Sequence, residues 1–291
     1  MRYSLLTVLL LLTLMLEACG DPKKTVTKAI EEYVTEVTNA PECNCYSDDV
    51  DLDALMELPK GGRGNDTLLI HCGHIVNYHQ TWRLPDWVAY ALTREETYGQ
   101  EERGNNFNAD PLLSRYPVQW YDYKKSGYDR GHMAPAGDMK WSEVAMEESF
   151  YMTNICPQDQ ELNRGRWNDL ENMVRKWARQ DSVVYVVCGP VVEDGCKKIG
   201  EHHDIAVPKG FFKVVLRQHR EKYQPTPQWQ AIAFYFDNVN TMEDLCTFAM
   251  SVDKIEQMTG LDFFPNLPDE VENVIEAVCD PAAWGLRPKR Q

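Results

Sequence analysis

Residues 128–138 read Tyr-Asp-Arg-Gly-His-Met-Ala-Pro-Ala-Gly-Asp, and they carry the strongest chemical signal in the chain. The imidazole of His132 has an ordinary pKa near neutrality, which suits a general base that takes a proton from water. The guanidinium of Arg130 can hold a phosphate through two parallel hydrogen bonds. Gly131 between them allows another part of the chain to approach closely. The stretch therefore predicts a base beside an anion-binding arginine.

A second segment of interest begins at Thr153. It reads Thr-Asn-Ile-Cys-Pro-Gln over residues 153–158 and Leu-Asn-Arg-Gly-Arg-Trp-Asn-Asp-Leu-Glu over residues 162–171. Apolar residues then recur at helical spacing, which predicts an amphipathic helix over residues 162–179. These apolar residues are Leu170, Met173, Val174, Trp177 and Ala178.

The start of this helix carries polar residues that suit a metal ion. Asn163, Trp167 and Glu171 are spaced i, i+4 and i+8, which places them on one stripe of a regular helix. Eight helical residues separate two Cα atoms by about 12 Å, so we do not expect Asn163 and Glu171 both to bind one ion directly. A single neutral oxygen ligand with several waters is typical of Mg²⁺, whereas zinc prefers several His or Cys ligands. We therefore expect Glu171 to act through water.

Together, these two segments closely resemble those of the DNA/RNA non-specific endonuclease family, the ββα-metal nucleases with an Asp-Arg-Gly-His signature. The resemblance extends from about Thr67 to about Cys279. It implies an α+β fold with a mixed, mostly antiparallel sheet and flanking helices. It also implies hydrolysis of phosphodiester bonds in DNA and RNA with a divalent metal, Mg²⁺ or alternatively Mn²⁺.

The functional residues of the family match positions of this chain one by one. The resemblance makes His132 the general base that activates water, Asn163 the metal ligand and Glu171 the carboxylate that holds metal-bound water. The remaining implied site residues are the phosphate-contacting Arg130, the upstream Arg103 in Glu-Arg-Gly-Asn over residues 102–105, and the supporting Asn154. Contacts to phosphate rather than to base edges imply little sequence preference. Cleavage is expected to leave a 5′ phosphate.

The rest of the chain predicts strands and helices in mixed order. Strand patterns cover residues 68–70 with 75–76, then 87–92, 183–188 closed by Gly189-Pro190, 211–216 and 229–236. Helical patterns cover residues 242–259 and 268–278, while residues 99–128 look irregular. This order favours an α+β domain over a doubly wound one. Because no linker divides residues 42–285, we interpret them as one nuclease domain.

The charge of the chain counts against nucleic-acid binding, because its formal net charge is -15 and phosphate backbones repel acidic proteins. The charge is unevenly distributed. Residues 237–280 hold eleven acids and one lysine, whereas residues 161–222 hold twelve bases and nine acids. A locally basic site on an acidic body is compatible with catalysis but not with strong non-specific binding.

The N-terminal residues 1–18 are typical of a signal peptide, with Arg2 before an apolar run from Leu5 to Leu16. The run is too short to span a bilayer. Residues 16–19, Leu-Glu-Ala-Cys, resemble a bacterial lipobox, although a Glu is unusual there. We therefore expect a lipidated Cys19 and a polar tether over residues 19–41 that hold an exported enzyme at a membrane. A plain secretory signal is the alternative.

Cysteines suit the oxidising compartment that export implies. Apart from Cys19 there are eight, and their connectivity cannot be deduced from sequence. The positions of Cys246 and Cys279 resemble a bridged pair in the family, so we expect these two to form a disulfide. Cys43 and Cys45 stay unassigned.

Two other classes of function remain open at this stage. One is a degenerate family member that binds nucleic acid or another partner without cutting it. The other is a zinc-binding surface lipoprotein that uses His71, Cys72, His74 and His79. Adjacent strand residues point to opposite faces, and the spacing is not that of a zinc site, so we favour a structural role for this cluster. A homodimer is a further hypothesis.

Overall fold

The computed structural model describes residues 45–46, 50–62, 66–113, 117–201, 203–220 and 226–288. Contacts between Cα atoms divide the chain into two units, residues 1–44 and residues 45–291. The predicted signal peptide, Cys19 and the tether lie outside the described residues. Within the described ranges, no helix is long and apolar enough to cross a membrane.

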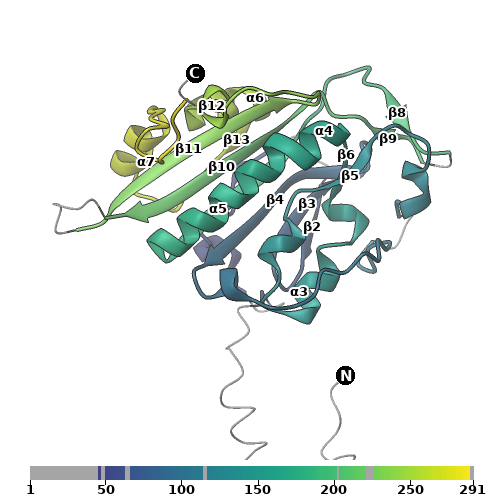
Figure 1. The fold of residues 1–291 in the computed structure, drawn as a ribbon, viewed down its shortest axis with the longest axis horizontal. Coiled ribbons are helices and arrows are strands. Elements are labelled where there is room, and N and C mark those ends of the chain that lie inside the picture. Colours follow the sequence, from purple (N-terminus) through teal and green to yellow (C-terminus); the bar gives the residue numbers. More distant parts are fainter. Residues whose placement is uncertain are drawn as a thin grey trace, which may run out of the picture. The chain divides into compact units, whose positions relative to one another are not determined.

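The second unit is built on a seven-stranded sheet in the order β12-β11-β10-β7-β4-β3-β2 (Figure 1). Every neighbouring pair in it is antiparallel. The strands are β2 (Asp66–Ile70), β3 (Ile75–His79), β4 (Leu84–Thr93), β7 (Val183–Val191), β10 (Gly210–His219), β11 (Gln228–Asp237) and β12 (Ala249–Met250). The predicted α+β class with a mostly antiparallel sheet is confirmed.

Both faces of this sheet are covered, because alternate residues of its central strands pack into two separate cores. On β10, Phe211 and Val215 belong to the core beneath helix α5 (Asn168–Asp181), together with Trp177. Phe212 and Val214 belong to the opposite core, where helix α6 (Val252–Thr259) packs. Helix α7 (Asp269–Glu276) contacts α6 and β11. Figure 1 shows α5 lying across one face of the sheet.

Shorter elements complete this unit. Strand β5 (Asp129–His132) pairs with β6 (Ile155–Gln158), β1 (Lys60–Gly61) with β13 (Leu261–Asp262), and β8 (Lys198–Ile199) with β9 (Ile205–Ala206). The remaining helical segments are η1 (Leu52–Ala54), η2 (Glu96–Tyr98), η3 (Trp120–Tyr123), η4 (Ala136–Asp138), α3 (Glu143–Glu148), η5 (Met152–Asn154), α4 (Gln160–Leu162), η6 (Asn163–Trp167) and η7 (Leu245–Thr247).

The helix predicted over residues 162–179 is interrupted. Its first part is α4, followed by the π-helical turn η6 and then α5. Gly165 inside η6 has φ −102° and ψ −108°, which is not a helical conformation. The single stripe that we predict is therefore wrong. Trp167 is fully buried against Phe211 and Phe236 of the sheet, whereas Asn163 and Glu171 line a cleft.

Two element boundaries also differ from those predicted. Strand β7 continues through Gly189 and Pro190, because Pro190 lies opposite Phe211 in the ladder with β10. The helix predicted over residues 242–259 begins only at Val252. Its expected first half contains η7 and the short strand β12, in which Ala249 pairs with Phe234 at the edge of the sheet.

The predicted disulfide between Cys246 and Cys279 is wrong, since both are free cysteines in this structure. Cys246 packs against the core on the α5 face. Cys279 is exposed beyond the end of α7, and the charge of Lys254 on α6 acts on it. A disulfide that the structure does show joins Cys45 to Cys72.

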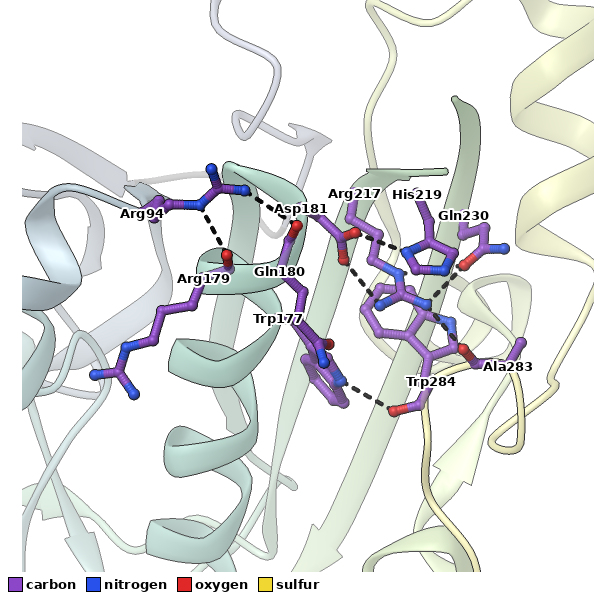
Figure 2. Close-up of polar contacts among 10 residues, drawn as sticks. All are labelled: Arg94, Trp177, Arg179, Gln180, Asp181, Arg217, His219, Gln230, Ala283 and Trp284. Carbon is purple, nitrogen blue, oxygen red and sulfur yellow. Dashed lines mark hydrogen bonds and ion pairs between the residues drawn. The ribbon is translucent and has the colours of Figure 1, made fainter. Parts of the chain in front are cut away.

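The segment after α7 returns to the α5 face and is held there by polar contacts (Figure 2). The indole N–H of Trp177 donates to the carbonyl oxygen of Trp284 at 3.0 Å. Arg217 on β10 donates to the carbonyl oxygen of Ala283 at 2.9 Å and forms an ion pair with Asp181 at 3.0 Å. These contacts fix the C-terminal segment against the end of α5.

Candidate active site

His132 lies at the end of β5, opposite Ile155 in the two-stranded ladder with β6. Gly131 is required there, since a Cβ atom at this position would collide with the side chain of Gln158. The loop after His132 is fixed by Asn154, which is fully buried. Its side-chain oxygen accepts from Ala134 N at 2.9 Å, and its amide donates to the carbonyl oxygens of Ala134 and Ser149, both at 2.8 Å.

The imidazole of His132 is 7% exposed and packs between two aromatic rings. Its ring centroid is 4.8 Å from that of Phe150, edge to face, and 5.4 Å from that of Phe107. Burial and the positive charges of Arg103 and Arg130 lower the pKa of His132 to about 3. The ring is therefore neutral at physiological pH and has a lone pair available for a proton.

This histidine lines a cleft of about 700 Å³ that also contains most of the other predicted residues. Arg103, Arg130, Asn163 and Glu171 all contribute side chains to it, whereas Asn154 does not. Asn154 therefore supports the site through the backbone rather than by contact with a ligand. The cleft is lined by five basic and two acidic residues, namely Lys124, Arg103, Arg130, Arg164 and Arg175, and Asp129 and Glu171. Its local charge is positive although the chain is acidic.

Aromatic side chains hold the two predicted arginines on one wall of the cleft. The guanidinium carbon of Arg130 is 4.0 Å from the ring centroid of Phe107, and that of Arg103 is 5.7 Å from the ring centroid of Phe150. These are the rings that enclose His132. Both arginines therefore pack against the aromatic rings that also contact His132. This packing brings Arg103 close to Arg130, although Arg103 lies well before residues 129–132 in the sequence.

Asn163 stands at the start of the π-helical turn, and its amide orientation is set by a neighbour. Its Nδ2 donates to Asp129 Oδ2 at 3.2 Å. Asp129 also accepts two hydrogen bonds from Arg164, at 2.9 and 3.0 Å. Among the described residues, no hydrogen bond to the amide oxygen of Asn163 is formed. This oxygen is a hard, neutral ligand of the kind that Mg²⁺ and Ca²⁺ accept, so the residue fits a divalent cation.

Glu171, on the first turn of α5, is half-buried and lines the same cleft. Burial raises the pKa of this carboxyl to about 7, and the charge of Asp138 acts in the same direction, while Lys213 and Arg175 oppose the shift. A cation in the cleft would favour the ionised form further. The donor set of Asn163 and Glu171 therefore fits a divalent metal held by one amide oxygen and supported by one carboxylate.

Sequence reasoning missed two cations that act on Glu171. Arg175 follows it by four residues on α5 and forms an ion pair with the fully buried Asp138. Lys213 is fully buried on β10, where its Nζ lies 4.8 Å from the ring centroid of Trp167 and 3.4 Å from the carbonyl oxygen of Met133. A signal existed for Lys213, because a lone lysine in the apolar run of residues 211–216 needs a polar partner.

The histidine and cysteine cluster of residues 71–79 does not form a zinc site. Cys72 is disulfide-bonded, so it offers no thiolate. His71 pairs with Asp110 at 3.0 Å, and His79 stacks on Trp82 with ring centroids 4.0 Å apart. The disulfide gives Cys72 the structural role that we predict for this cluster, and the zinc alternative loses its thiolate ligand.

Fold and site together define an α+β protein whose basic, metal-compatible cleft suits phosphate esters. The chain belongs to the DNA/RNA non-specific endonuclease family, whose model matches residues 53–270. It is 38% identical to the mitochondrial nuclease EXOG of Danio rerio over 211 residues, which are 68% of this chain and 60% of that protein. It is 34% identical to the nuclease of Serratia marcescens over 229 residues, which are 74% of this chain and 80% of that protein.

A solved structure agrees with the fold. The crystal structure of the EndoG/EndoGI complex superposes with a TM-score of 0.67 at 28% identity, covering 78% of this chain and 96% of that chain. The match to the EXOG proteins of fish and human spans 60% and 56% of their lengths, so it does not extend over the whole of these relatives.

Proposed function

We propose that the chain is an endonuclease that hydrolyses phosphodiester bonds of DNA and RNA with the help of a divalent cation. The observation that carries this proposal is the neutral His132 in a cleft where Arg103 and Arg130 supply positive charge. A base that is unprotonated and an anion-binding pair of arginines are the two requirements for attack of water on a phosphate diester.

His132 then acts as the general base. Its pKa of about 3 reflects the repulsion of Arg103 and Arg130 in addition to burial. A bound phosphate would offset these two charges and bring the pKa of His132 closer to neutrality, where a base is most effective. The imidazole takes a proton from water as that water attacks phosphorus. The arginines stabilise the negative charge that develops on the phosphate oxygens.

Asn163 and Glu171 are the residues that we propose to hold the metal, Asn163 directly and Glu171 through water. When bound, a divalent cation such as Mg²⁺ polarises the phosphate and stabilises the leaving oxygen, and Mn²⁺ can replace it. The geometry supports this division of roles, because Asp129 occupies the amide N–H of Asn163 and leaves its oxygen for the cleft. The positive charges of Lys213 and Arg175 favour the ionised form of Glu171 by lowering its pKa.

The residues at the edge of the cleft favour a nucleic-acid substrate whose bases are unpaired. Trp120 is 43% exposed and lines the cleft, with Lys124 Nζ 4.4 Å from its ring centroid. Exposed aromatic rings beside lysines stack on unpaired bases without reading sequence. We therefore propose that Trp120 contacts a base of the substrate while the arginines contact its phosphate.

For location we propose export, with Cys19 as a lipid anchor. The support is the sequence alone, since these residues lie outside the described ranges. The test is membrane fractionation and intact mass of the mature N-terminus for the wild type and Cys19→Ser. A soluble wild type without a diacylglyceryl group would show a freely secreted enzyme instead.

The decisive experiment for the activity is degradation of supercoiled plasmid and of RNA by the purified chain, with and without EDTA. Loss of both substrates in Mg²⁺, abolished by EDTA, is expected. Retention of nucleic acid in a gel-shift assay without cleavage in Mg²⁺ or Mn²⁺ would instead show a degenerate family member that binds but does not cut.

A further inference from the structure

Helices α6 and α7 bring three carboxylates together on the side of the sheet opposite α5. Asp253 and Glu256 lie three residues apart on α6, and Glu276 is the last residue of α7. One oxygen from each of the three side chains lies within 4.8 Å of the others. Figure 1 shows these two helices near the C-terminal end of the chain. The catalytic cleft is lined by residues of α5 and β5, so the acidic group is not part of it.

Glu276 differs from an ordinary surface acid because it is buried. Only 5% of its surface is exposed, and its Oε1 atom is buried without a hydrogen-bond partner. Oε1 of Glu272, one turn earlier, is also buried without a partner. Burying a carboxylate oxygen without a donor or a cation is costly. The backbone N–H of Phe263, which donates to Glu256 at 3.0 Å, serves another member of the group and leaves Glu276 uncompensated.

Neighbouring carboxylates add to the energetic cost of ionising Glu276. The charges of Glu256, Glu272, Asp262 and Asp253 all act on Glu276 in the same direction as its burial, so they disfavour its ionised form. Lys60 is the cation that acts on Glu272. It is exposed on β1, which makes it a weak counterion for a buried oxygen. In the part of the chain that the structure describes, these three carboxylates therefore form no ion pair with a cationic side chain.

We propose that Asp253, Glu256 and Glu276 form a second cation site, which takes a hard divalent ion and prefers Ca²⁺. Oxygen ligands surround Ca²⁺ at about 2.3–2.6 Å, so oxygens on opposite sides of one ion are about 4.6–5.2 Å apart. The three oxygens all lie within 4.8 Å of one another, so they fit within the shell of one Ca²⁺ ion. Mg²⁺ demands shorter distances of about 2.0–2.1 Å and near-ideal octahedral geometry, to which three helix-borne carboxylates adapt poorly. Asp253 and Glu256 are half-exposed, which leaves room for waters to complete the shell.

An ion at this site would tie α7 to α6. Helix α7 contacts β11 and α6, and its Val274 is 63% exposed, so an ion bound by Glu276 would add a further attachment for this helix. Binding to the folded state alone raises stability with ion concentration. Ca²⁺ would thus act as a structural ion on one side of the sheet while catalysis uses its own metal on the other.

The test is calorimetric titration of the full chain with CaCl₂, carried out in an Asn163→Ala background so that ion binding at the catalytic metal position is weakened. One Ca²⁺ per chain is expected, with a Kd of about 10–1000 μM, together with a rise in melting temperature. Adding Glu276→Gln should weaken Ca²⁺ binding at least tenfold and abolish the rise. Adding Asp253→Asn is a second variant with the same expected effect, in case Glu276→Gln fails to fold.

The matched control is Glu270→Gln, an equal loss of charge at an exposed position of the same helix. It should leave the affinity for Ca²⁺ unchanged. Equal weakening by Glu270→Gln and Glu276→Gln would show diffuse attraction to an acidic surface and overturn the site. Absence of saturable binding, with Glu276→Gln simply raising the melting temperature, would show that Glu276 is a protonated, ion-free carboxyl, and this would overturn the proposal too.

Discussion

The guanidinium carbon of Arg217 lies 3.9 Å from the ring centroid of Trp284. The same guanidinium donates to the carbonyl oxygen of Ala283, which is 66 residues later in the sequence (Figure 2). Arg217 is 1% exposed, and all of its polar partners are inside the protein. They are Asp181 at the end of α5, Gln230 on β11 and the Ala283 carbonyl group. One buried cation therefore joins the sheet, α5 and the C-terminal segment.

This relationship predicts that Arg217→Ala strongly destabilises the fold. Removing one partner of a buried ion pair costs about 3–5 kcal/mol. Among the described residues, Asp181 would keep the ring Nδ1 of His219, 2.7 Å away, as its remaining side-chain contact. The measurement is urea denaturation followed by tryptophan fluorescence. Arg220→Ala, an exposed arginine near the same strand, is the control and should change the free energy of unfolding by less than about 0.5 kcal/mol. Equal stability of the two variants would show that the buried cluster contributes little.

His132→Ala should lower the rate of plasmid cleavage by about 10²–10⁴-fold without loss of the fold, because it removes the general base alone. Initial rates at saturating Mg²⁺ and circular dichroism spectra measure the two quantities. His79→Ala, which changes a histidine outside the cleft, should cleave nearly normally. A folded His132→Ala enzyme with near-normal turnover would refute the role of this residue.

The metal roles predict different effects for two variants. Asn163→Ala should lose activity and require more Mg²⁺ or Mn²⁺ for any residual rate. Glu171→Ala should show a milder form of the same dependence, since groups that act through metal-bound water are worth about 10–100-fold. Metal titrations of the cleavage rate measure both. If Glu171→Ala impaired metal affinity more than Asn163→Ala, the direct and the water-mediated roles would have to be exchanged.

Glu171 should also make stability depend on pH when no metal is bound. Its folded pKa is raised to about 7, so between the ordinary carboxyl value and pH 7 the folded state binds more protons than the unfolded state. Stability from this group is therefore greatest at low pH and decreases as pH rises through 7. In EDTA at pH 8, Glu171→Gln should melt higher than the wild type, and a given concentration of Mg²⁺ should stabilise it less. Glu161→Gln, which alters an exposed carboxyl, should do neither.

Trp120→Ala should raise KM for single-stranded substrates by about 5- to 160-fold, because stacking of a base on an aromatic ring is worth about 1–3 kcal/mol. Duplex DNA, whose bases are already stacked, should be affected less. The neighbouring Tyr121 is 42% exposed but does not line the cleft, so Tyr121→Ala is the matched control. A uniform increase in KM for both substrate forms would argue for electrostatic or structural effects instead.

The sequence alone determined the local chemistry of the site. Residues 129–132 are adjacent in the chain, so His132 and Arg130 reach one cleft whatever the packing around them. Asn163 and Glu171 lie eight residues apart in one segment, so the sequence predicted that both serve one site, although the turn at Gly165 interrupts the helix that we predict. Short apolar runs predicted the strands β4, β7, β10 and β11, because a strand covered on both faces of its sheet is apolar at nearly every position.

Only the tertiary structure decided which distant groups act on these residues. Phe107 and Phe150 enclose His132, and Lys213 reaches the side of the sheet where Glu171 lies, although no spacing in the sequence connects them. The same holds for the disulfide from Cys45 to Cys72 and for the free Cys246 and Cys279. Local patterns follow from backbone geometry, which repeats along the chain. Contacts between distant segments follow from how two cores close on opposite faces of one sheet, and that depends on the packing of the whole unit.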